Sequence, residues 1–221
     1  MFPNWAKNIL FLLVYMISGL VLVIIIEGLV SGSDLLPLND VIERVITQMR
    51  TPLLTSFLVI ITKLSDPFIL SCVAVFLSAL LIMRGHSYDA ALFLAAMVLA
   101  VISLTILKNI FQITRPASDI YAPGGPWSFP SGHATVAAAF FFLLAHTFFG
   151  RMKTVGRKTA LIIGSIIAAG LVCFSRLYLG AHWTLDILAG VALGLLIVSF
   201  TVLIFNIFIP DKRSLRKLIN F

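Results

Sequence analysis

The chain has 221 residues, of which 60% are hydrophobic and only 11% are charged, and its mean hydropathy is +1.09. Soluble domains carry about 45–50% apolar and about 25% charged residues. The composition therefore excludes an ordinary soluble protein, a disordered chain and a nucleic-acid-binding domain. A membrane chain is counted in spans of about 20 residues, and roughly six of them fit this length. The two cysteines, Cys72 and Cys173, lie in long apolar runs, which favours core-filling roles over a disulfide or a metal site.

The first apolar run extends from about Ile9 to Val30. It is too long for the core of a signal peptide and no small-x-small cleavage site follows it, so we expect a retained membrane span. Glu27 lies near the outer end of this span, where an interfacial carboxylate is tolerated. The alternative is a functional acid within the membrane.

A short amphipathic helix is predicted after the first span. Apolar residues recur at helical spacing and form one stripe: Leu38, Val41, Ile42, Val45, Ile46 and Met49. Asn39 or Asp40 can cap the start of this helix, and Pro52 stops it. A helix of this kind lies on the membrane surface. The apolar segment Leu53–Leu64 predicts a second short interfacial or partly inserted helix, and the alternative is one kinked helix over Leu53–Met83.

Five further spans are predicted at about residues 67–83, 89–113, 132–149, 159–179 and 183–209. All should be helical, because lipid offers backbone groups no hydrogen-bonding partners. We therefore expect an all-α, polytopic membrane protein with six transmembrane helices and one or two short interfacial helices between the first and second spans. Residues 1–221 are interpreted as a single domain, with a polar motif core at residues 108–186.

The distribution of lysine and arginine predicts the orientation of the chain. One side of the membrane collects most of the basic residues: Lys7, Arg84, Arg151, Lys153, Arg157, Lys158, Lys212, Arg213, Arg216 and Lys217. The loops on the other side hold Arg44, Arg50 and Arg115, with acidic residues among them. This bias predicts that both termini are cytoplasmic. Topology and contact with anionic lipid explain the net charge of +7, so a nucleic-acid partner is not expected.

Polar residues that topology does not require gather at the outer ends of the last four spans. The first group contains Lys108, Arg115 and Pro116. Lys108 and Arg115 are two helical turns apart, which predicts that both project from one face of a span, with Lys108 about 10 Å deeper. Pro116 ends the helix at Arg115. The alternative is a pair of interfacial cations, which is weaker for Lys108 because it lies inside an apolar span.

The second group, Pro130-Ser131-Gly132-His133, follows a Pro- and Gly-rich loop at Pro123–Pro126 and starts the next span. Backbone N–H groups at a helix start, with Ser131 and a glycine that permits close approach, suit a phosphate or another oxyanion. The alternative is an ordinary capped helix with His133 as a surface histidine.

The third group runs from Ser175-Arg176 to Asp186. His182 and Asp186 are four residues apart at the start of the last span, so the carboxylate can hold one imidazole nitrogen and present the other. Arg176 and His182 would be separated on one continuous helix, but Gly180 permits a turn that lets them converge. The alternative is a structural His–Asp hydrogen bond.

The three groups together supply three cations, backbone donors, two histidines and one aspartate. Three cations directed at one point suit a multiply charged anion, of which phosphate is the obvious one. A histidine held by an aspartate is a nucleophile or base, and a second histidine can be an acid. No carboxylate cluster accompanies them, so neither a metal ion nor another cofactor is expected. The pattern predicts metal-free phosphoryl transfer.

The motifs Lys-x6-Arg-Pro, Pro-Ser-Gly-His and Ser-Arg-x5-His-x3-Asp, in this order, resemble the three signatures of the type 2 phosphatidic acid phosphatase superfamily. Every fixed position is present, and the six-span layout extends the likeness over nearly all of the chain. The resemblance implies that His182 attacks phosphorus to form a phosphohistidine, that Asp186 orients it and that His133 protonates the leaving group. It also implies a set of phosphate-binding residues: Lys108, Arg115, Ser131, Gly132 and Arg176.

The hydrophobicity of the chain is similar to that of the integral-membrane branch, whose members dephosphorylate lipids at the outer leaflet. The resemblance implies a substrate such as undecaprenyl diphosphate, phosphatidylglycerophosphate, phosphatidate or a lipid A phosphate. The compact size and short loops resemble bacterial members, which implies a cytoplasmic-membrane protein with its active site facing the periplasm or the exterior.

Two other functions compete with this interpretation. One is a six-span transporter or channel with its basic and histidine residues along a path, and the other is an inactive lipid-binding scaffold. Transport sites tend to lie near the bilayer midplane, whereas these motifs are predicted at one membrane face. A scaffold is disfavoured because no catalytic position of the motifs is missing.

Overall fold

The structure is a computed structural model that describes residues 4–32, 36–117, 120 and 125–208. Within these ranges the chain forms eight α-helices and no strand. Five of the helices are long and apolar enough to cross a membrane: α1 (Asn4–Ser31), α5 (Ser87–Phe111), α6 (Gly132–Phe149), α7 (Val155–Tyr178) and α8 (Thr184–Phe208). The prediction of an all-helical, polytopic membrane protein is confirmed.

A sixth candidate span, by length and composition, is a pair of helices, α3 (Pro52–Leu64) and α4 (Pro67–Met83), which meet at a bend of 46°. The carboxylate of Asp66 accepts a hydrogen bond from the Phe68 N–H at 2.9 Å and caps α4. Pro67 occupies the first turn of α4, where a missing N–H costs nothing. The sequence left open whether residues 53–83 form one kinked helix or two helices, and the structure has two helices joined at a capped break.

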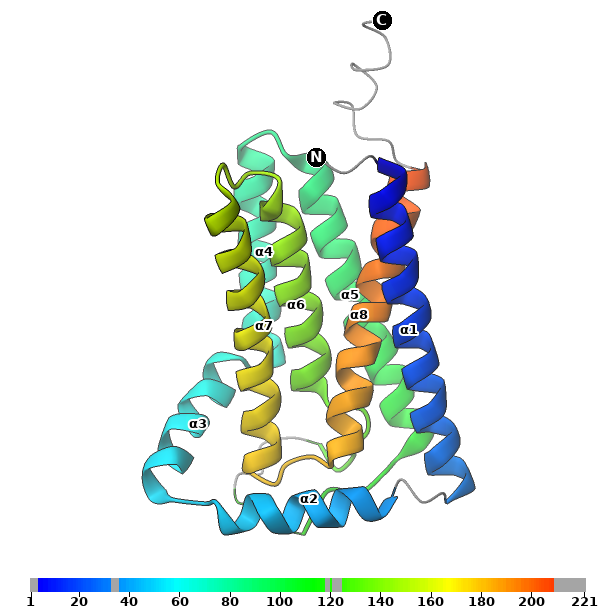
Figure 1. Ribbon diagram of the computed structural model, residues 1–221, viewed down its shortest axis with the longest axis vertical. Helices are drawn as coiled ribbons and strands as arrows, with labels where there is room; N and C mark the ends of the chain where they lie inside the picture. Colours follow the sequence, from blue (N-terminus) through cyan, green and yellow to red (C-terminus); the bar gives the residue numbers. More distant parts are fainter. Residues whose placement is uncertain (1–3, 33–35, 118–119, 121–124, 209–221) are drawn as a thin grey trace, which may run out of the picture.

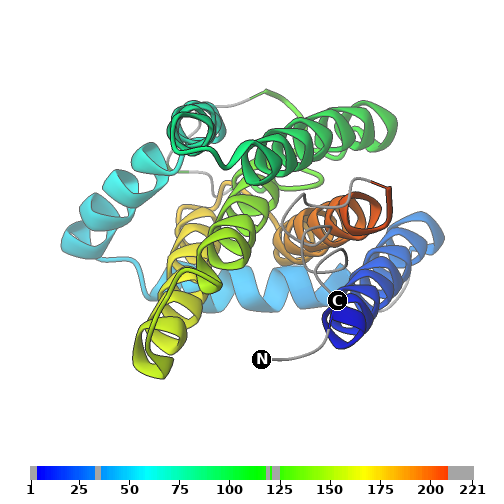
Figure 2. The same ribbon diagram turned by 90° about the horizontal axis from the view of Figure 1, so that it is seen from above.

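The spans run side by side, and α2 (Leu36–Gln48) lies across one end of the bundle, the lower end in Figure 1. The first residues of α1 and the last residues of α8 lie together at the opposite end (Figure 1). Figure 2, which looks along the bundle, shows α1 and α3 on opposite sides of it. The basic residues Arg84, Arg151 and Lys153 follow helices that finish at the end away from α2, whereas Lys212–Lys217 lie outside the described residues.

The close packing of α6 against α8 forms the centre of the bundle. Gly190 and Gly194 of α8 face the backbone of α6: a Cβ added to Gly190 would lie 2.7 Å from the Ser131 carbonyl oxygen, and one added to Gly194 would lie 2.5 Å from that of Thr135. Small residues four positions apart let membrane helices approach closely. Because Ser131 caps α6, this contact positions the first turn of α6 against α8.

α2 differs from the sequence prediction in its start. It begins at Leu36, so Asn39 lies within its first turns and does not cap it. The Asn39 side chain instead accepts a hydrogen bond from the Leu185 N–H at 3.2 Å and satisfies a free amide at the start of α8. The apolar stripe is split: Ile46 is buried beside α3 and α7, while Val41 and Val45 are exposed.

Two further sequence interpretations can be compared with the structure. Cys72 is exposed on α4, so the core-filling prediction is wrong for it, while Cys173 is partly buried. A cysteine behaves as a small apolar residue, so it can face lipid as well as the protein core. Its place in a hydrophobic run therefore does not imply burial. Glu27 is exposed near the end of α1, as the interfacial interpretation expects.

Candidate active site

The three polar sequence groups meet at the end of the bundle that carries α2. Lys108 lies in the last turn of α5, His133 in the first turn of α6, Arg176 in the last turn of α7 and His182 in the turn before α8. They share a cavity of about 430 Å³, lined by Asp66, Pro67, Phe68, Leu104, Thr105, Lys108, Asn109, Arg115, Gly125, Trp127, Gly132, His133, Arg176 and His182. Helix ends, and not one helical face, bring the groups together.

The sequence predicted that Lys108 and Arg115 project from one face of a helix, and the structure shows that they do not. α5 ends at Phe111, and Gln112 has a left-handed backbone with φ of 47° that turns the chain away. Arg115 therefore lies in the following loop, where its guanidinium donates to the carbonyls of Gly125 at 3.0 Å and Ala181 at 2.6 Å. The Lys108 Nζ donates to the Trp127 carbonyl at 2.8 Å. Backbone carbonyls thus hold both cations at the cavity, while Pro123 and Gly124 of the same loop lie outside the described residues.

His182 and Asp186 form a buried pair behind the cavity. Gly180 has a φ of 72°, and this turn separates α7 from α8 as the sequence predicted. The His182 Nδ1 lies 3.4 Å from the Asp186 Oδ2, and both side chains are 2% exposed. The His182 Nε2 lies 3.4 Å from the Arg115 Nη1 on the side of the cavity. One ring nitrogen therefore faces the carboxylate and the other faces the cations.

The environment of His182 favours its neutral form. Burial, together with the positive charges of Arg176, Arg115 and Lys108, holds the pKa of His182 well below its usual range. Burial and nearby like charge both disfavour a charged imidazole. A neutral ring whose Nδ1–H faces Asp186 carries its lone pair on Nε2, which points toward the cavity.

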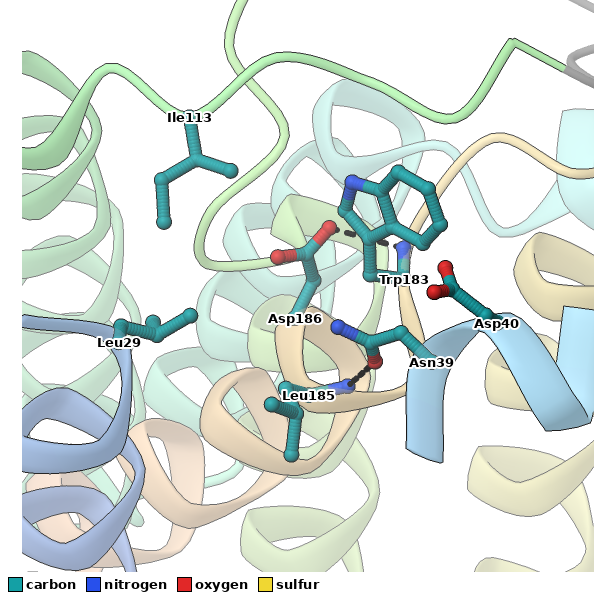
Figure 3. A pocket seen from close by; sticks show the side chains of 7 residues that line it. All are labelled: Leu29, Asn39, Asp40, Ile113, Trp183, Leu185 and Asp186. Carbon is teal, nitrogen blue, oxygen red and sulfur yellow. Dashed lines mark hydrogen bonds between the residues drawn. The ribbon is translucent and has the colours of Figure 1, made fainter. Parts of the chain in front are cut away.

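A smaller cavity of about 190 Å³ lies on the other side of Asp186, between α2 and the start of α8 (Figure 3). Asp186 accepts a hydrogen bond from the Trp183 N–H at 2.9 Å, and Figure 3 shows this bond beside the one from Leu185 to Asn39. The Trp183 indole donates to the Thr114 carbonyl at 3.0 Å. α2 and the loop before Arg115 thus fix the start of α8, which carries Asp186.

The bend between α3 and α4 contacts two residues of the motifs. Arg176 is 1% exposed, and its Nη1 donates to the Thr62 Oγ1 at 2.9 Å. His133 hydrogen bonds with the backbone of Thr62, and its Nε2 lies 3.9 Å from the Asp66 Oδ2. Sequence reasoning missed Thr62 and Asp66 as site residues. Their spacing of four places them near each other, but nothing in the sequence showed that α3 packs on α7.

Ser131 and Gly132 are placed differently from each other. Ser131 is fully buried, its N–H donates to the Asp186 carbonyl at 3.0 Å, and its Oγ caps α6 by accepting from the Ala134 N–H. Ser131 is not among the residues that line the cavity, and its role as a phosphate ligand stays a prediction. Its backbone N–H joins the start of α6 to α8. Gly132, one residue later, does line the cavity.

In the described ranges, no three His, Cys, Asp or Glu side chains come close enough to hold a metal ion. The site is instead a cavity bordered by Lys108, Arg115 and Arg176 at one end of a membrane-spanning bundle. This arrangement defines an integral membrane protein with a cavity at one end of its bundle that three cations border.

The sequence profile described as the PAP2 superfamily matches residues 89–209, and the chain belongs to this superfamily. Phosphatidylglycerophosphatase B of Bacillus subtilis is 29% identical over 161 residues, which cover 72% of this chain and 79% of that protein. An undecaprenyl-diphosphatase of Sulfolobus acidocaldarius is 28% identical over 171 residues, 75% of this chain and 78% of that protein.

The fold is also similar to a crystal structure. The transmembrane PAP2-type phosphatidylglycerolphosphate phosphatase from Bacillus subtilis matches with a TM-score of 0.75 and 25% identity, over 93% of this chain and 98% of that one. The resemblance inferred from the three motifs is thus confirmed at the level of the family, which is one of membrane lipid phosphatases.

Proposed function

We propose that this protein hydrolyses a lipid phosphate or diphosphate at the outer face of the membrane through a phosphohistidine on His182. The observation that supports this most strongly is the environment of His182: a neutral, buried imidazole with one nitrogen toward Asp186 and the other toward a cavity bordered by cations. A nucleophile oriented by a carboxylate and facing a phosphate site is the arrangement that covalent phosphoryl transfer requires.

In the first step Lys108, Arg115 and Arg176 bind the phosphate oxygens, together with the N–H of Gly132 at the start of α6. The three side chains stabilise the charge that develops on these oxygens in the transition state. Ser131 contributes indirectly, because its own N–H holds the start of α6 against Asp186.

The His182 Nε2 then attacks phosphorus, and the bond from phosphorus to the leaving oxygen breaks. The leaving oxygen belongs to a lipid alcohol or, for a diphosphate, to the phosphate that stays on the lipid. His133 gives this oxygen a proton, while Asp186 stabilises the positive charge on the His182 ring. A water molecule next attacks phosphorus, His133 accepts the proton of that water, and inorganic phosphate leaves as His182 is restored.

A lipid substrate is supported by the walls of the cavity. Phe68 and Leu104 line the same cavity as the three cations, and Phe68 is 74% exposed on the outside of the bundle. Such a cavity suits a ligand with a phosphate at one end and a hydrocarbon chain at the other. The names of the relatives make phosphatidylglycerophosphate and undecaprenyl diphosphate candidate substrates. Phosphatidate and a lipid A phosphate are further candidates.

The orientation follows from charge. The site and the basic loops occupy opposite ends of the bundle, and the positive-inside rule places basic loops in the cytoplasm. We therefore propose cytoplasmic termini and an active site that faces the periplasm or the exterior. A transporter is less well supported, because the cations and histidines border a cavity at one end of the spans and not near their middle.

The test is phosphate release by the purified protein in detergent across a panel of lipid phosphates and diphosphates, with and without EDTA. We expect hydrolysis of at least one lipid that persists in EDTA and is abolished by His182→Ala. His86→Ala, which changes a histidine before α5 at the opposite end of the bundle, is the matched control and should retain activity. Absence of release from every lipid, or loss on chelation with recovery on added Mg²⁺, contradicts the proposal.

A further inference from the structure

Asp66 is an acidic residue of the cavity that belongs to none of the three motifs. It lies at the bend between α3 and α4, outside residues 89–209, which the family profile matches. Among the described residues that line the cavity it is the one carboxylate. Its Oδ1 caps α4 by accepting from the Phe68 N–H, which leaves Oδ2 to face the His133 Nε2 at 3.9 Å.

The other charged groups around His133 are basic. Arg176 on α7 and Arg115 in the loop after α5 act on His133 electrostatically, Lys108 on α5 borders the same cavity, and His182 in the turn before α8 is held neutral. Positive neighbours disfavour a protonated imidazole, which is the form that a general acid must have. A carboxylate on the open side of the ring opposes this effect.

The geometry keeps the proton of His133 available. The backbone of Thr62 holds the ring, and the distance of 3.9 Å from Nε2 to the Asp66 carboxylate is longer than a hydrogen bond. The Asp66 carboxylate therefore does not hold the Nε2–H in a hydrogen bond, and its negative charge still acts on the ring while a leaving oxygen takes the proton. The Asp66 side chain is 47% exposed, and a lipid phosphate bound in the cavity excludes water and strengthens this attraction.

We propose that Asp66 is a positioning residue that keeps His133 protonated for transfer of a proton to the leaving group. This inference rests on the proposed function, because it assigns Asp66 to the proton-donation step. The same carboxylate lies in a cavity that binds an anion, so its charge must also weaken binding of phosphate.

The Asp66→Asn variant distinguishes the effect of the Asp66 charge on His133 from the role of Asp66 as the cap of α4. Asparagine is also a good N-cap, so the hydrogen bond to the Phe68 N–H is kept and only the charge is lost. On a lipid monophosphate we expect kcat near neutral pH to fall about three- to tenfold, KM to fall, and the alkaline limb of the rate profile to move to lower pH. On an activated aryl phosphate, whose leaving group needs no proton, kcat should hardly change. Asp89→Asn, which removes a partly buried carboxylate paired with Arg151 at the other end of the bundle, is the matched control.

A double-mutant cycle with His133→Ala tests whether Asp66 acts through His133. Asp66→Asn should cause no further loss of kcat in the His133→Ala background. An unchanged pH profile, equal losses on both substrates, or the same loss with and without His133 overturns the inference. If Asp66→Asn does not fold, Asp66→Ser keeps a capping oxygen without charge and is measured in the same way. An inactive wild type, or an active His182→Ala, refutes the proposed function instead, so the two failures are distinguishable.

Discussion

Replacing Gly190 with alanine is expected to disturb the active site from within the bundle. Gly190 is not among the residues that line the cavity, but it faces the start of α6. The added Cβ would lie 2.7 Å from the Ser131 carbonyl oxygen, 3.0 Å from the Ala134 Cβ and 3.1 Å from the Thr135 Oγ1. Ordinary contacts begin near 3.4 Å, so the first turn of α6 must retreat by several tenths of an ångström. Gly132 and His133 lie in that turn and move with it.

The size of the effect follows from this displacement. Overpacking of a tight core costs about 1–3 kcal/mol, and a catalytic misplacement of about 1 Å costs about 10²-fold in rate. We therefore expect Gly190→Ala to lower the unfolding midpoint and to reduce kcat/KM by about tenfold. Gly164→Ala on α7 is the control, because its added Cβ has no heavy atom within 4 Å beyond its chain neighbours and the backbone of its own helix. In a helix interior this exchange should stabilise by up to about 1 kcal/mol.

The assay compares thermal unfolding in detergent with phosphate release for both variants and the wild type. The reduced rate should already be seen at temperatures where Gly190→Ala is still folded, since the displacement acts on the site before it unfolds the bundle. If Gly190→Ala keeps the wild-type rate and midpoint, or if Gly164→Ala loses as much of both, the argument from α6–α8 packing is refuted.

Three further predictions concern the histidines and the topology. His133→Ala should lose about 10⁴-fold on a lipid monophosphate but only about 10²-fold on an activated aryl phosphate, and equal losses would refute its role as the acid. Because the pKa of His182 lies below its usual range, the rate of phosphoenzyme formation, corrected for substrate ionisation, should show no acid limb centred near 6.5 when measured between about pH 5 and 8. A fall in this rate centred near pH 6.5 would show that the pKa of His182 is not lowered, which would contradict the prediction. Ala117→Cys, in a chain lacking Cys72 and Cys173, should react with an impermeant thiol reagent in intact cells, and labelling only after permeabilisation would reverse the proposed orientation.

The sequence predicted which residues border the cavity better than it predicted their geometry. Lys108, His133 and His182 do border one cavity, because spans of similar length bring helix ends to the same membrane face. Gly180 turns the chain as expected. The predicted position of Arg115 on the helix was wrong, because the left-handed backbone at Gln112 ends α5 before Arg115. A left-handed residue at a helix end is usually glycine or asparagine, so the glutamine gave no signal of this end.

Contacts between distant segments could not be predicted from local pattern. Asn39 was expected to cap its own helix, yet its partner is the amide of Leu185 on α8. Thr62 bonds to Arg176 because α3 folds against α7, and the predicted interfacial segment carried no sign of that packing. Ser131 looked like a phosphate ligand because helix starts bind anions. Only the packed structure shows its N–H already bonded to Asp186.

The identity of the phosphorylated residue tests the central claim most directly. In His133→Ala, an activated aryl phosphate can still phosphorylate the nucleophile, while the base needed for hydrolysis is missing, so a phosphoenzyme should accumulate. Acid-free quenching and peptide mass spectrometry should find the phosphate on His182, and the double variant with His182→Ala should carry none. Phosphate on any other residue, or a labelled double variant, would contradict the mechanism.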